Sequence, residues 1–262
     1  MSKVSRKIIS WNVNGIRAAE RKGFMQWIAR AKPDVLGLQE TRIDDLILPE
    51  RLRVLDGYHA VWSFAQKKGY SGTALYTREK PVKTYAAIGD DAYDHEGRMT
   101  AAELSDVIIC NAYFPKGSGT LRDNSRVPFK LGFYRAFFDW ALLLAKRRKK
   151  PLVVMGDFNT AHENIDLKNW KTNSGTSGFL PEERAEMTKQ LERGFADTFR
   201  RLHPSVARYS WWSQRMGARA RNIGWRIDYV WVSEKLMPRV KEAFIDVEVL
   251  GSDHCPVGIV LG

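Results

Sequence analysis

The sequence predicts an α/β fold in which two sheets pack together and direct their strand ends toward one site. Three features support this: short apolar runs typical of buried strands, helix-period segments between them, and polar residues directly after several runs. The polar residues occur in both halves of the chain, in SWNVNG and LQE and again in MGDFN and GSDHCP. Because no linker or low-complexity tract interrupts the chain, we expect a single domain over residues 1–262.

Apolar composition and periodicity place the individual elements. The predicted strands are Ile8–Trp11, Val35–Leu38, Thr73–Tyr76, Val107–Tyr113, Leu152–Met155 and Ile227–Val232. Several are apolar at consecutive positions, as expected for strands that are covered on both faces. The predicted helices are Gly23–Ala31, Phe129–Leu144 and Pro181–Leu202. The first is followed by Pro33, which stops a helix, and the last opens with Pro-Glu-Glu, a good helix start.

Composition excludes several classes of protein. With 44% hydrophobic and 11% aromatic residues, the 262-residue chain can bury a large core, which excludes intrinsic disorder. Only 20 Gly and two Cys exclude collagen-like and disulfide-scaffold chains. Cys110 and Cys255 lie in apolar contexts and are predicted to be buried thiols in a reducing compartment. Met1–Lys7 is polar and lacks a signal core, so we expect a cytoplasmic protein.

The net charge of +12 indicates a polyanionic partner. Nucleic acid is the leading candidate and an anionic membrane surface the second, while a role in solubility alone is the remaining interpretation. The segment Tyr209–Trp225 favours nucleic acid because it mixes arginine with tryptophan. Its relevant residues, with the next arginine, are Trp211, Trp212, Arg215, Arg219, Arg221, Trp225 and Arg226. The alternative is a core tryptophan pair beside a solvated basic loop; Lys146–Lys150 is interpreted as solvated surface at a helix end.

Asn12, Asn14 and Glu40 are candidate functional residues in the first half. Strand alternation puts the side chains of Asn12 and Asn14 on one face, although Asn-Gly at 14–15 is also a common turn dipeptide. Glu40 closes an apolar run, and a buried carboxylate there needs a partner or a metal ion. The alternative for Glu40 is a helix cap or a surface side chain.

The second half supplies further candidates at strand ends. Asp157 and Asn159 share a face in GDFN, where the acid can accept a proton and the amide can donate to an anionic oxygen. An Asx-turn is the alternative there. Asp253 and His254 are adjacent near the end of the chain. Asp228 can orient the His254 imidazole, because a carboxylate that accepts a hydrogen bond from one ring nitrogen fixes the tautomer of the ring. Tyr113 follows a buried strand and either donates to a phosphate or forms an aromatic lid.

The candidates together form an oxygen-rich set. Carboxylate and amide oxygens suit Mg²⁺ or Mn²⁺ rather than Zn²⁺, and the sequence has no CxxC or HExxH spacing. It also lacks a P-loop and a GxGxxG fingerprint, which disfavours nucleotide-driven phosphoryl transfer. The clustered acids would place local negative charge in a protein of net charge +12. A metal ion bound by the acids would neutralise that charge and could bind a phosphodiester.

Ten motifs occur in order over almost the whole chain: KIISWNVNGIRA, DVLGLQET, KGYSG, YFP, GDFNTAH, IDLKNWK, SGFLPEER, YSWWS, NIGWRIDY and GSDHCPVG. With them the sequence resembles the exonuclease III family of abasic-site (AP) endonucleases, within the endonuclease/exonuclease/phosphatase superfamily. The resemblance implies a four-layer αββα sandwich of two packed mixed sheets flanked by helices, like DNase I. It implies Mg²⁺-dependent cleavage of the phosphodiester 5′ to an abasic site, with 3′→5′ exonuclease or 3′-phosphodiesterase activity in addition. Mn²⁺ is expected to substitute for Mg²⁺.

The resemblance also implies a role for each candidate. Glu40 would be the main metal ligand, with Asn12 and Asp253 nearby. Asp157 would activate the attacking water, Asn159 and Tyr113 would hold the phosphate, and His254 paired with Asp228 would stabilise negative charge. The residues expected to contact DNA are Asn14, Tyr70, Lys116, Arg215, Trp211, Trp225 and Ile227.

Within the DNA-contacting set, Trp211, Trp225 and Ile227 match a small apolar pocket for a flipped-out abasic sugar. Lys116 stands where many members have Asn, which keeps a phosphate donor but not the amide geometry. The expected partner is double-stranded DNA with abasic sites. We expect the protein to be a monomer and not to bind a membrane. Two alternatives remain: a phosphatase or phosphodiesterase of the same superfamily acting on inositol phosphates or lipids, and a non-catalytic DNA-binding module.

Overall fold

The computed structural model describes residues 5–121 and 123–262, and it contains two six-stranded mixed sheets. The first sheet has the order β13-β14-β1-β2-β4-β3, and the second has the order β5-β6-β7-β8-β12-β9. The strands of the first sheet are β1 Arg6–Asn12, β2 Val35–Gln39, β3 His59–Ser63, β4 Thr73–Thr77, β13 Val240–Ile245 and β14 Val257–Leu261. Those of the second are β5 Lys83–Tyr85, β6 Met99–Glu103, β7 Ile108–Tyr113, β8 Leu152–Asp157, β9 Phe195–Asp197 and β12 Asp228–Ser233.

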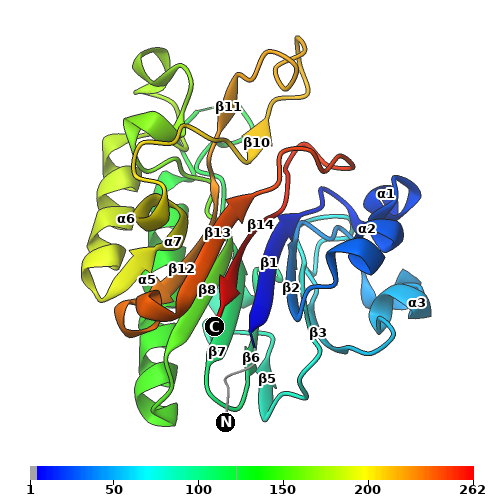
Figure 1. Cartoon of the computed structure of the whole chain (residues 1–262). Helices are drawn as coiled ribbons and strands as arrows, with labels where there is room; N and C mark the ends of the chain where they lie inside the picture. Colours follow the sequence, from blue (N-terminus) through cyan, green and yellow to red (C-terminus); the bar gives the residue numbers. More distant parts are fainter. Residues whose placement is uncertain (1–4, 122) are drawn as a thin grey trace.

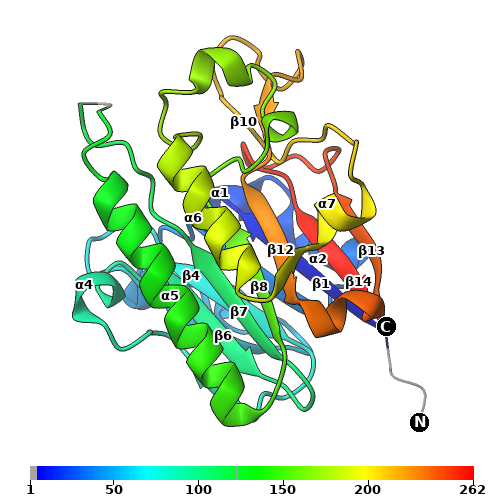
Figure 2. The ribbon, with the colours of Figure 1, turned by 90° about the vertical axis from the view of Figure 1, so that its left-hand side faces the viewer.

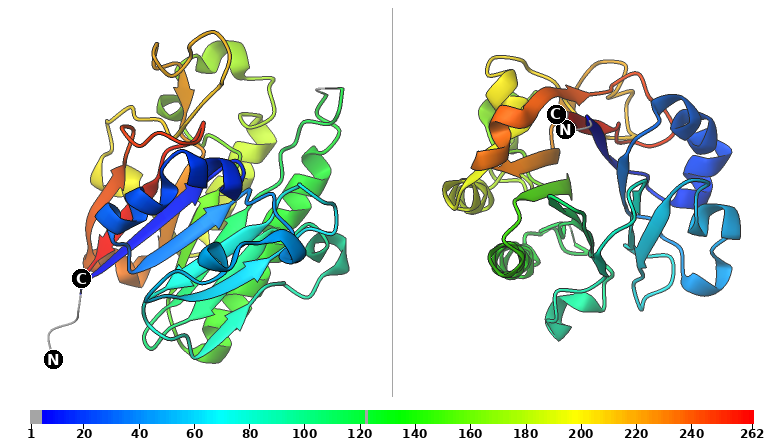
Figure 3. Two further views of the ribbon diagram at one scale, coloured as in Figure 1. Left: turned by 90° about the vertical axis from the view of Figure 1, so that its right-hand side faces the viewer. Right: turned by 60° about the horizontal axis from the view of Figure 1, so that its bottom comes forward.

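The two sheets face each other and helices cover their outer faces (Figure 1). Against the first sheet lie α1 Ile16–Arg21, α2 Phe24–Ala31 and α3 Glu50–Arg53. Against the second lie α5 Val127–Arg148 and α6 Pro181–Glu192, which run side by side across it (Figure 2). The short helices α4 Asp91–Asp94 and α7 Thr198–Leu202 lie at the margins. This is the expected αββα sandwich, and the end-on view in Figure 3 shows its layers.

Strand alternation divides the apolar residues among the layers. Ile8 of β1 and Val153 of β8 lie in the core between the sheets, while Ile9 and Val154 pack against helices. The strands of the sheet centre are therefore buried on both faces, as their continuous apolar runs predict. In the part of the chain that the structure describes, no helix is both long and apolar enough to cross a bilayer.

All six predicted strands are confirmed, with bounds that differ by one or two residues. The prediction of one helix over Pro181–Leu202 is wrong. Gly194, with φ of 102°, ends the first helix, and Phe195–Asp197 then pairs with β12 as an edge strand before α7 begins. Buried apolar residues keep a helix-like spacing across this break. Met187, however, packs in the core between the second sheet and its helices, whereas Phe199 packs in the core between the two sheets. The buried, unpaired state of Cys110 and Cys255 is confirmed.

Candidate active site

The site lies at the edge of the sandwich where the central strands of both sheets end. β1 and β2 are parallel, with Asn12 beside Gln39, and β7 and β8 are parallel, with Tyr113 beside Asp157. β12 runs the other way and begins at Asp228, opposite Asp157. Parallel strands end at one edge, so the topology alone gathers residues that are far apart in sequence.

Gly156 makes the close approach at this edge possible. It has φ of 148°, and a Cβ built on it would lie 1.8 Å from the carbonyl oxygen of Ala112 in the neighbouring strand. Any side chain would therefore separate β7 from β8 just before Asp157. The glycine of the GDFN motif is thus required by strand packing, not only by turn geometry.

Glu40 is buried and surrounded by donors. It accepts hydrogen bonds from the amide Nδ2 of Asn12 at 3.1 Å and from the hydroxyl of Tyr113 at 2.7 Å. Arg42 forms an ion pair with its second oxygen, and Lys116 Nζ lies 3.6 Å from the first. Burial raises the pKa of Glu40, but Lys116, Arg42 and the Tyr113 hydrogen bond overcome this and lower it to about 2. Glu40 is therefore a permanent carboxylate at neutral pH.

Asp157 is completely buried and behaves in the opposite way. Asn12 Nδ2 donates to its Oδ2 at 2.9 Å, and His254 Nε2 lies 3.9 Å from the same oxygen. Burial and the nearby charge of Asp228 raise the pKa of Asp157 to about 7, although His254 opposes the shift. A carboxyl group with a pKa near 7 is suited to accept a proton at neutral pH.

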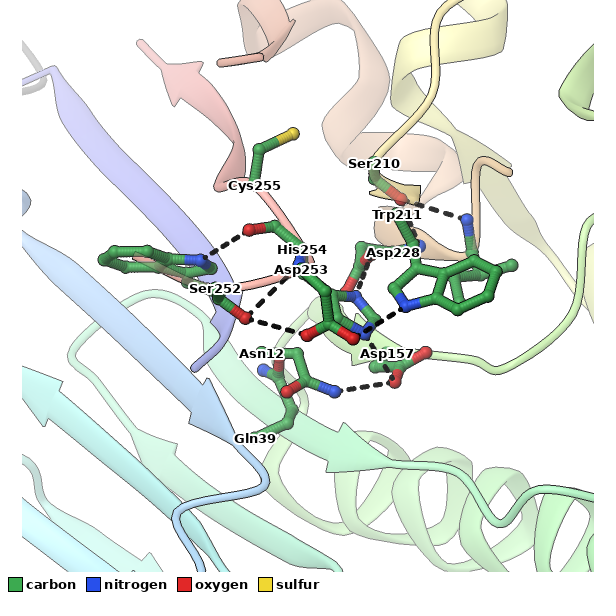
Figure 4. A network of polar contacts seen from close by, with 12 residues as sticks. Asn12, Gln39, Asp157, Ser210, Trp211, Asp228, Ser252, Asp253, His254 and Cys255 are labelled. Carbon is green, nitrogen blue, oxygen red and sulfur yellow. Dashed lines mark hydrogen bonds and ion pairs between the residues drawn. The ribbon is translucent and has the colours of Figure 1, made fainter. Parts of the chain in front are cut away.

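His254 is held by Asp228 on the side away from Asp157. Its Nδ1 lies 2.8 Å from Asp228 Oδ2, so Nε2 is directed into the site (Figure 4). Burial lowers the pKa of His254, but Asp228 and Asp157 outweigh it and raise the pKa to about 9. The imidazole is therefore positively charged at neutral pH and is held by a carboxylate, the pairing expected from the sequence.

Asp253 faces a neighbouring set of donors. Asn14 Nδ2 donates to its Oδ1 at 2.8 Å and Trp211 Nε1 donates to its Oδ2 at 3.1 Å. Asn14 and Gly15, with φ of 47° and 102°, form a turn beyond the end of β1, so strand alternation does not place the Asn14 side chain. Its backbone N–H donates to Asn12 Oδ1, and its contact with DNA stays a prediction. Burial raises the pKa of Asp253, but His254 and the two hydrogen bonds lower it below its usual value.

Two carboxylates of the site fit a cation. One oxygen of Glu40, one oxygen of Asp157 and a ring nitrogen of His254 lie within 4.8 Å of one another. Because the imidazole is protonated, the two carboxylates are the groups able to act as ligands. The two carboxylates provide hard oxygen donors, which suit Mg²⁺ or Mn²⁺. Asn12 directs its amide nitrogen, not its oxygen, at Glu40, and Asp253 is bonded to Asn14 and Trp211. The placement of Asn12 and Asp253 beside a metal ion stays a prediction.

A hollow of about 200 Å³ opens beside the acids. Trp211, Trp225 and Ile227 supply its apolar lining, and Asn159 and His254 supply polar groups. Trp211 and Trp225 meet edge to face, with ring centroids 6.2 Å apart, across the hairpin of β10 Trp211–Trp212 and β11 Gly224–Trp225. The structure therefore brings together the three residues that the resemblance assigned to a sugar pocket.

Asn159 forms the expected Asx-turn, and the donation of its amide to a phosphate stays a prediction. Its backbone N–H donates to Asp157 Oδ1 at 2.8 Å, which is the Asx-turn, and its φ is 49°. Its side-chain amide then donates to the Phe114 carbonyl at 2.8 Å and borders the hollow. The turn is thus what directs the amide toward the site.

The basic segment after Trp212 is only partly a solvent-facing loop. Arg226 is 1% exposed and its guanidinium bonds to Asp166 and Asp197, so it cannot contact nucleic acid. Arg219 donates to three backbone carbonyls of residues 247–252 and thereby holds the loop before Asp253. Arg215 is exposed in the loop that joins β10 to β11. The arginines of one sequence window therefore differ in environment, because acids distant in sequence neutralise Arg226.

Tyr70 and Lys116 line a second hollow, of about 430 Å³, on the other side of Glu40. Arg98 donates to the Tyr70 hydroxyl at 2.8 Å and packs over the Tyr113 ring at 4.9 Å. Arg42 borders the same hollow, so its floor is acidic at Glu40 and its walls are mostly basic. Neither Arg42 nor Arg98 is among the site residues predicted from the sequence. Arg42 stands two residues after Glu40, a signal that was available, whereas nothing local distinguishes Arg98.

The fold and this site define a phosphoester hydrolase, and comparison with known proteins agrees. Residues 9–254 match the family model described as the endonuclease/exonuclease/phosphatase family, so the chain belongs to that family. An exodeoxyribonuclease of Bacillus subtilis is 42% identical over 97% of this chain and 99% of its own length. The DNA repair nuclease APEX1 of Danio rerio is 40% identical over 97% of this chain and 82% of its own. The family predicted from the motifs is confirmed.

Solved structures place the fold in the same group. The AP endonuclease LMAP of Leishmania major superposes with a TM-score of 0.88 at 31% identity, covering 98% of this chain and 87% of that chain. The 3′-5′ exonuclease NExo of Neisseria meningitidis superposes with a TM-score of 0.89 at 28% identity, covering 97% of this chain and 99% of the other. The predicted fold class is confirmed by these likenesses.

Proposed function

We propose that this chain is a Mg²⁺-dependent DNA-repair nuclease that hydrolyses the phosphodiester on the 5′ side of an abasic site. One observation carries the proposal: a hollow with a tryptophan and isoleucine lining opens directly beside His254, Asn159 and the buried acids. A sugar without a base fits a small apolar space, whereas a stacked, paired nucleotide must first be unstacked at a cost of a few kcal/mol.

The charges of the site suit the chemistry of this cleavage. Water attacks phosphorus, the bond from phosphorus to the 3′ oxygen breaks, and a 3′-hydroxyl and a 5′-phosphate result. Asp157, whose pKa is raised to about 7, accepts the proton of the attacking water. His254, held positive by Asp228, stabilises the negative charge that develops on the phosphate oxygens. Asn159 and Tyr113, which in this structure donate to the Phe114 carbonyl and to Glu40, would add hydrogen bonds by turning to the phosphate.

A divalent cation held by Glu40 would supply Lewis-acid stabilisation of the phosphate oxygens. Glu40 remains ionised to low pH, and a carboxylate oxygen of Asp157 lies within 4.8 Å of one of its oxygens, so the residues present fit such an ion. Arg42 and Lys116, which pair with Glu40 in this structure, are then available to the phosphate backbone. The choice of Mg²⁺ with Mn²⁺ as a substitute rests on the oxygen donors.

We infer duplex DNA as the substrate from the net charge of +12 and from the basic walls around Glu40. The same phosphate site suits hydrolysis at a 3′ end, and one similar structure is described as a 3′-5′ exonuclease. An inositol phosphate or lipid substrate needs no extended basic surface, and a purely DNA-binding module needs no buried acids beside a charged histidine. A single catalytic domain, a monomeric state and a cytoplasmic location stay predictions.

The deciding experiment is a substrate panel on the purified chain. The panel contains a duplex with one tetrahydrofuran abasic analogue, the same duplex undamaged, a duplex with a recessed 3′ end, and a soluble inositol phosphate. We expect nicking 5′ to the analogue with Mg²⁺ and none with EDTA. Hydrolysis of the inositol phosphate with an intact abasic duplex would refute the proposal in favour of the phosphatase alternative.

A further inference from the structure

Two opposite charges are completely buried behind the hollow. Lys130 of α5 and Glu183 of α6 are 0% exposed, and Lys130 Nζ lies 2.7 Å from Glu183 Oε1. Neither side chain lines the hollow or contacts the acids of the site. Removing two charges from water is so costly that such a pair persists only where further hydrogen bonds satisfy both groups. The partners in those hydrogen bonds indicate what the pair does.

Lys130 binds the backbone at a residue of the site. Its Nζ donates to the carbonyl oxygen of Asn159 at 2.6 Å. Asn159 has φ of 49°, a left-handed conformation that asparagine adopts more readily than most residues and that the Asx-turn with Asp157 already supports. The lysine adds a second support to the turn that directs the Asn159 amide toward the hollow.

Glu183 binds the facing segment, Ser177–Leu180. Its Oε2 accepts the backbone N–H groups of Gly178 at 2.5 Å and Leu180 at 3.1 Å. Its Oε1 accepts the Ser177 hydroxyl at 3.0 Å in addition to the Lys130 ammonium. One carboxylate thus fixes the start of α6 and the loop before it.

The segment that Glu183 holds is part of the wall of the hollow, and there is no spare room there. A Cβ on Gly178 would lie 3.2 Å from the Asn159 carbonyl oxygen and 3.2 Å from a ring carbon of Trp225. The backbone of Gly178 therefore packs closely between the Asn159 turn and the ring of Trp225. A small shift of this segment changes the width of the hollow directly.

We propose that Lys130 and Glu183 are positioning residues that set the width of the sugar pocket and so its selectivity for a baseless nucleotide. The inference rests on the proposed function, because it assigns the hollow to that sugar. An apolar pair of similar size would fill the same space. It would, however, leave the Asn159 carbonyl and the N–H groups of Gly178 and Leu180 without these partners, and the wall would relax.

Two double variants without an unpaired buried charge test this. Lys130→Met/Glu183→Leu removes every side-chain hydrogen bond that the pair makes to Asn159 and to Ser177–Leu180, and leaves the backbone hydrogen bond from Ala161 to Gly178. Lys130→Met/Glu183→Gln keeps one oxygen for the N–H groups of Gly178 and Leu180. The control Lys150→Met/Glu103→Gln removes the ion pair of 2.8 Å between Lys150 and Glu103, near the C-terminal end of α5. Melting temperature and circular dichroism report folding for each protein.

The measured quantity is the ratio of two dissociation constants in EDTA, undamaged duplex over the same duplex with a tetrahydrofuran analogue. We expect the Leu variant to lose about tenfold of this ratio and the Gln variant about threefold, as hydrogen bonds of about 1 kcal/mol are removed. Affinity for undamaged DNA should stay near that of the wild type. The control should melt earlier and keep its ratio.

The possible failures are distinguishable. A wild-type ratio near one would refute the sugar pocket itself, and thus the proposed function, before any variant is compared. A wild-type preference that a folded Gln or Leu variant retains in full would overturn only the positioning role. If the Leu variant does not fold, the Gln variant decides, because it already lacks the bond from residue 130 to Asn159. A ratio that falls in the control as well would show a general effect of lost stability and would also overturn the role.

Discussion

Asp228 and His254 form a buried pair in which Nδ1 of the imidazole lies 2.8 Å from Oδ2 of the carboxylate, with Nε2 facing Asp157. The two residues are 26 positions apart and come from β12 and from the bridge before β14. The pair gives the site a cation that is internal to the protein, next to acids that would otherwise repel a phosphate.

Replacing Asp228 by Asn should remove the negative charge that raises the pKa of His254. The imidazole would then be largely neutral at neutral pH, and incision of an abasic duplex should slow by on the order of 100-fold or more. Single-turnover kinetics with saturating enzyme measures this directly. If incision continues within about twofold of the wild type, the charge on His254 does not matter for the reaction.

Asp157→Asn should abolish turnover and leave binding intact, because an amide cannot accept the proton of the attacking water. The substitution keeps the shape of a completely buried side chain, so the fold should persist. Gel shift with an abasic duplex measures affinity, and a nicking assay measures turnover. Near-normal turnover would reject the proton-accepting role of Asp157.

The predictability of this site from sequence differs among its residues. Glu40 and Asp157 follow apolar runs and Asp228 precedes one, so strand periodicity locates them. They meet because β1 pairs with β2 and β7 with β8 in parallel, β12 starts opposite the end of β8, and the two sheets pack together. Arg226 shows the limit of such reasoning. It lies in a segment rich in basic and aromatic residues, but its side chain is buried and forms ion pairs with Asp166 and Asp197. These acids are distant in sequence and approach Arg226 only in the folded chain, so the segment itself does not reveal them.

The break in the predicted helix over Pro181–Leu202 has a related cause. Helical spacing of apolar residues continues through Gly194, but Phe195–Asp197 forms a strand there because it pairs with the free edge of β12. Which partner is available at a sheet edge is a tertiary property, so local periodicity predicts the wrong element there.

Glu40→Gln should weaken cation binding, because it removes one of the two carboxylates that converge on the candidate site. We expect the Mg²⁺ concentration for half-maximal incision to rise by about tenfold or more. Thermal melting adds an independent readout, since an ion that binds only the folded state raises the melting temperature. Wild-type protein and the Glu79→Gln control, which alters a pair with Arg6 remote from the site, should both gain stability with Mg²⁺. An unchanged Mg²⁺ response in Glu40→Gln would contradict the assignment.

Trp225→Ala should impair selectivity for abasic DNA more than general affinity for duplex DNA. The ring lines the hollow and contacts Trp211 edge to face, so its removal enlarges the space that would exclude a base. Binding constants for abasic and undamaged duplexes measure the two effects separately, with Trp140→Ala on the outer helix α5 as the control. Equal losses on both DNAs would remove Trp225 from the pocket.

Acid should destabilise the protein through the ion cluster of Asp166 and Arg226, behind the Trp225–Ile227 wall. Burial raises the pKa of Asp166, but Arg226 and Arg200 overcome this and lower it below the usual 3.8. Because the folded-state pKa is depressed, the carboxylate contributes its full stability above the unfolded pKa. That contribution is lost as the pH falls through the still lower folded value, so the window lies below about pH 4.

The variant Asp166→Asn separates this cluster from general acid unfolding. At pH 7 it should lose about 3 kcal/mol, because Arg226 and Arg200 keep their charges while a buried partner is neutralised. Below pH 4 the wild type protonates Asp166 itself, so the difference in melting temperature between the two proteins should narrow. Asp139→Asn, which alters an exposed pair with Arg193, should follow the wild type at every pH. A gap that stays constant from pH 7 to pH 3 would show that the stability of the cluster does not depend on the ionised carboxylate.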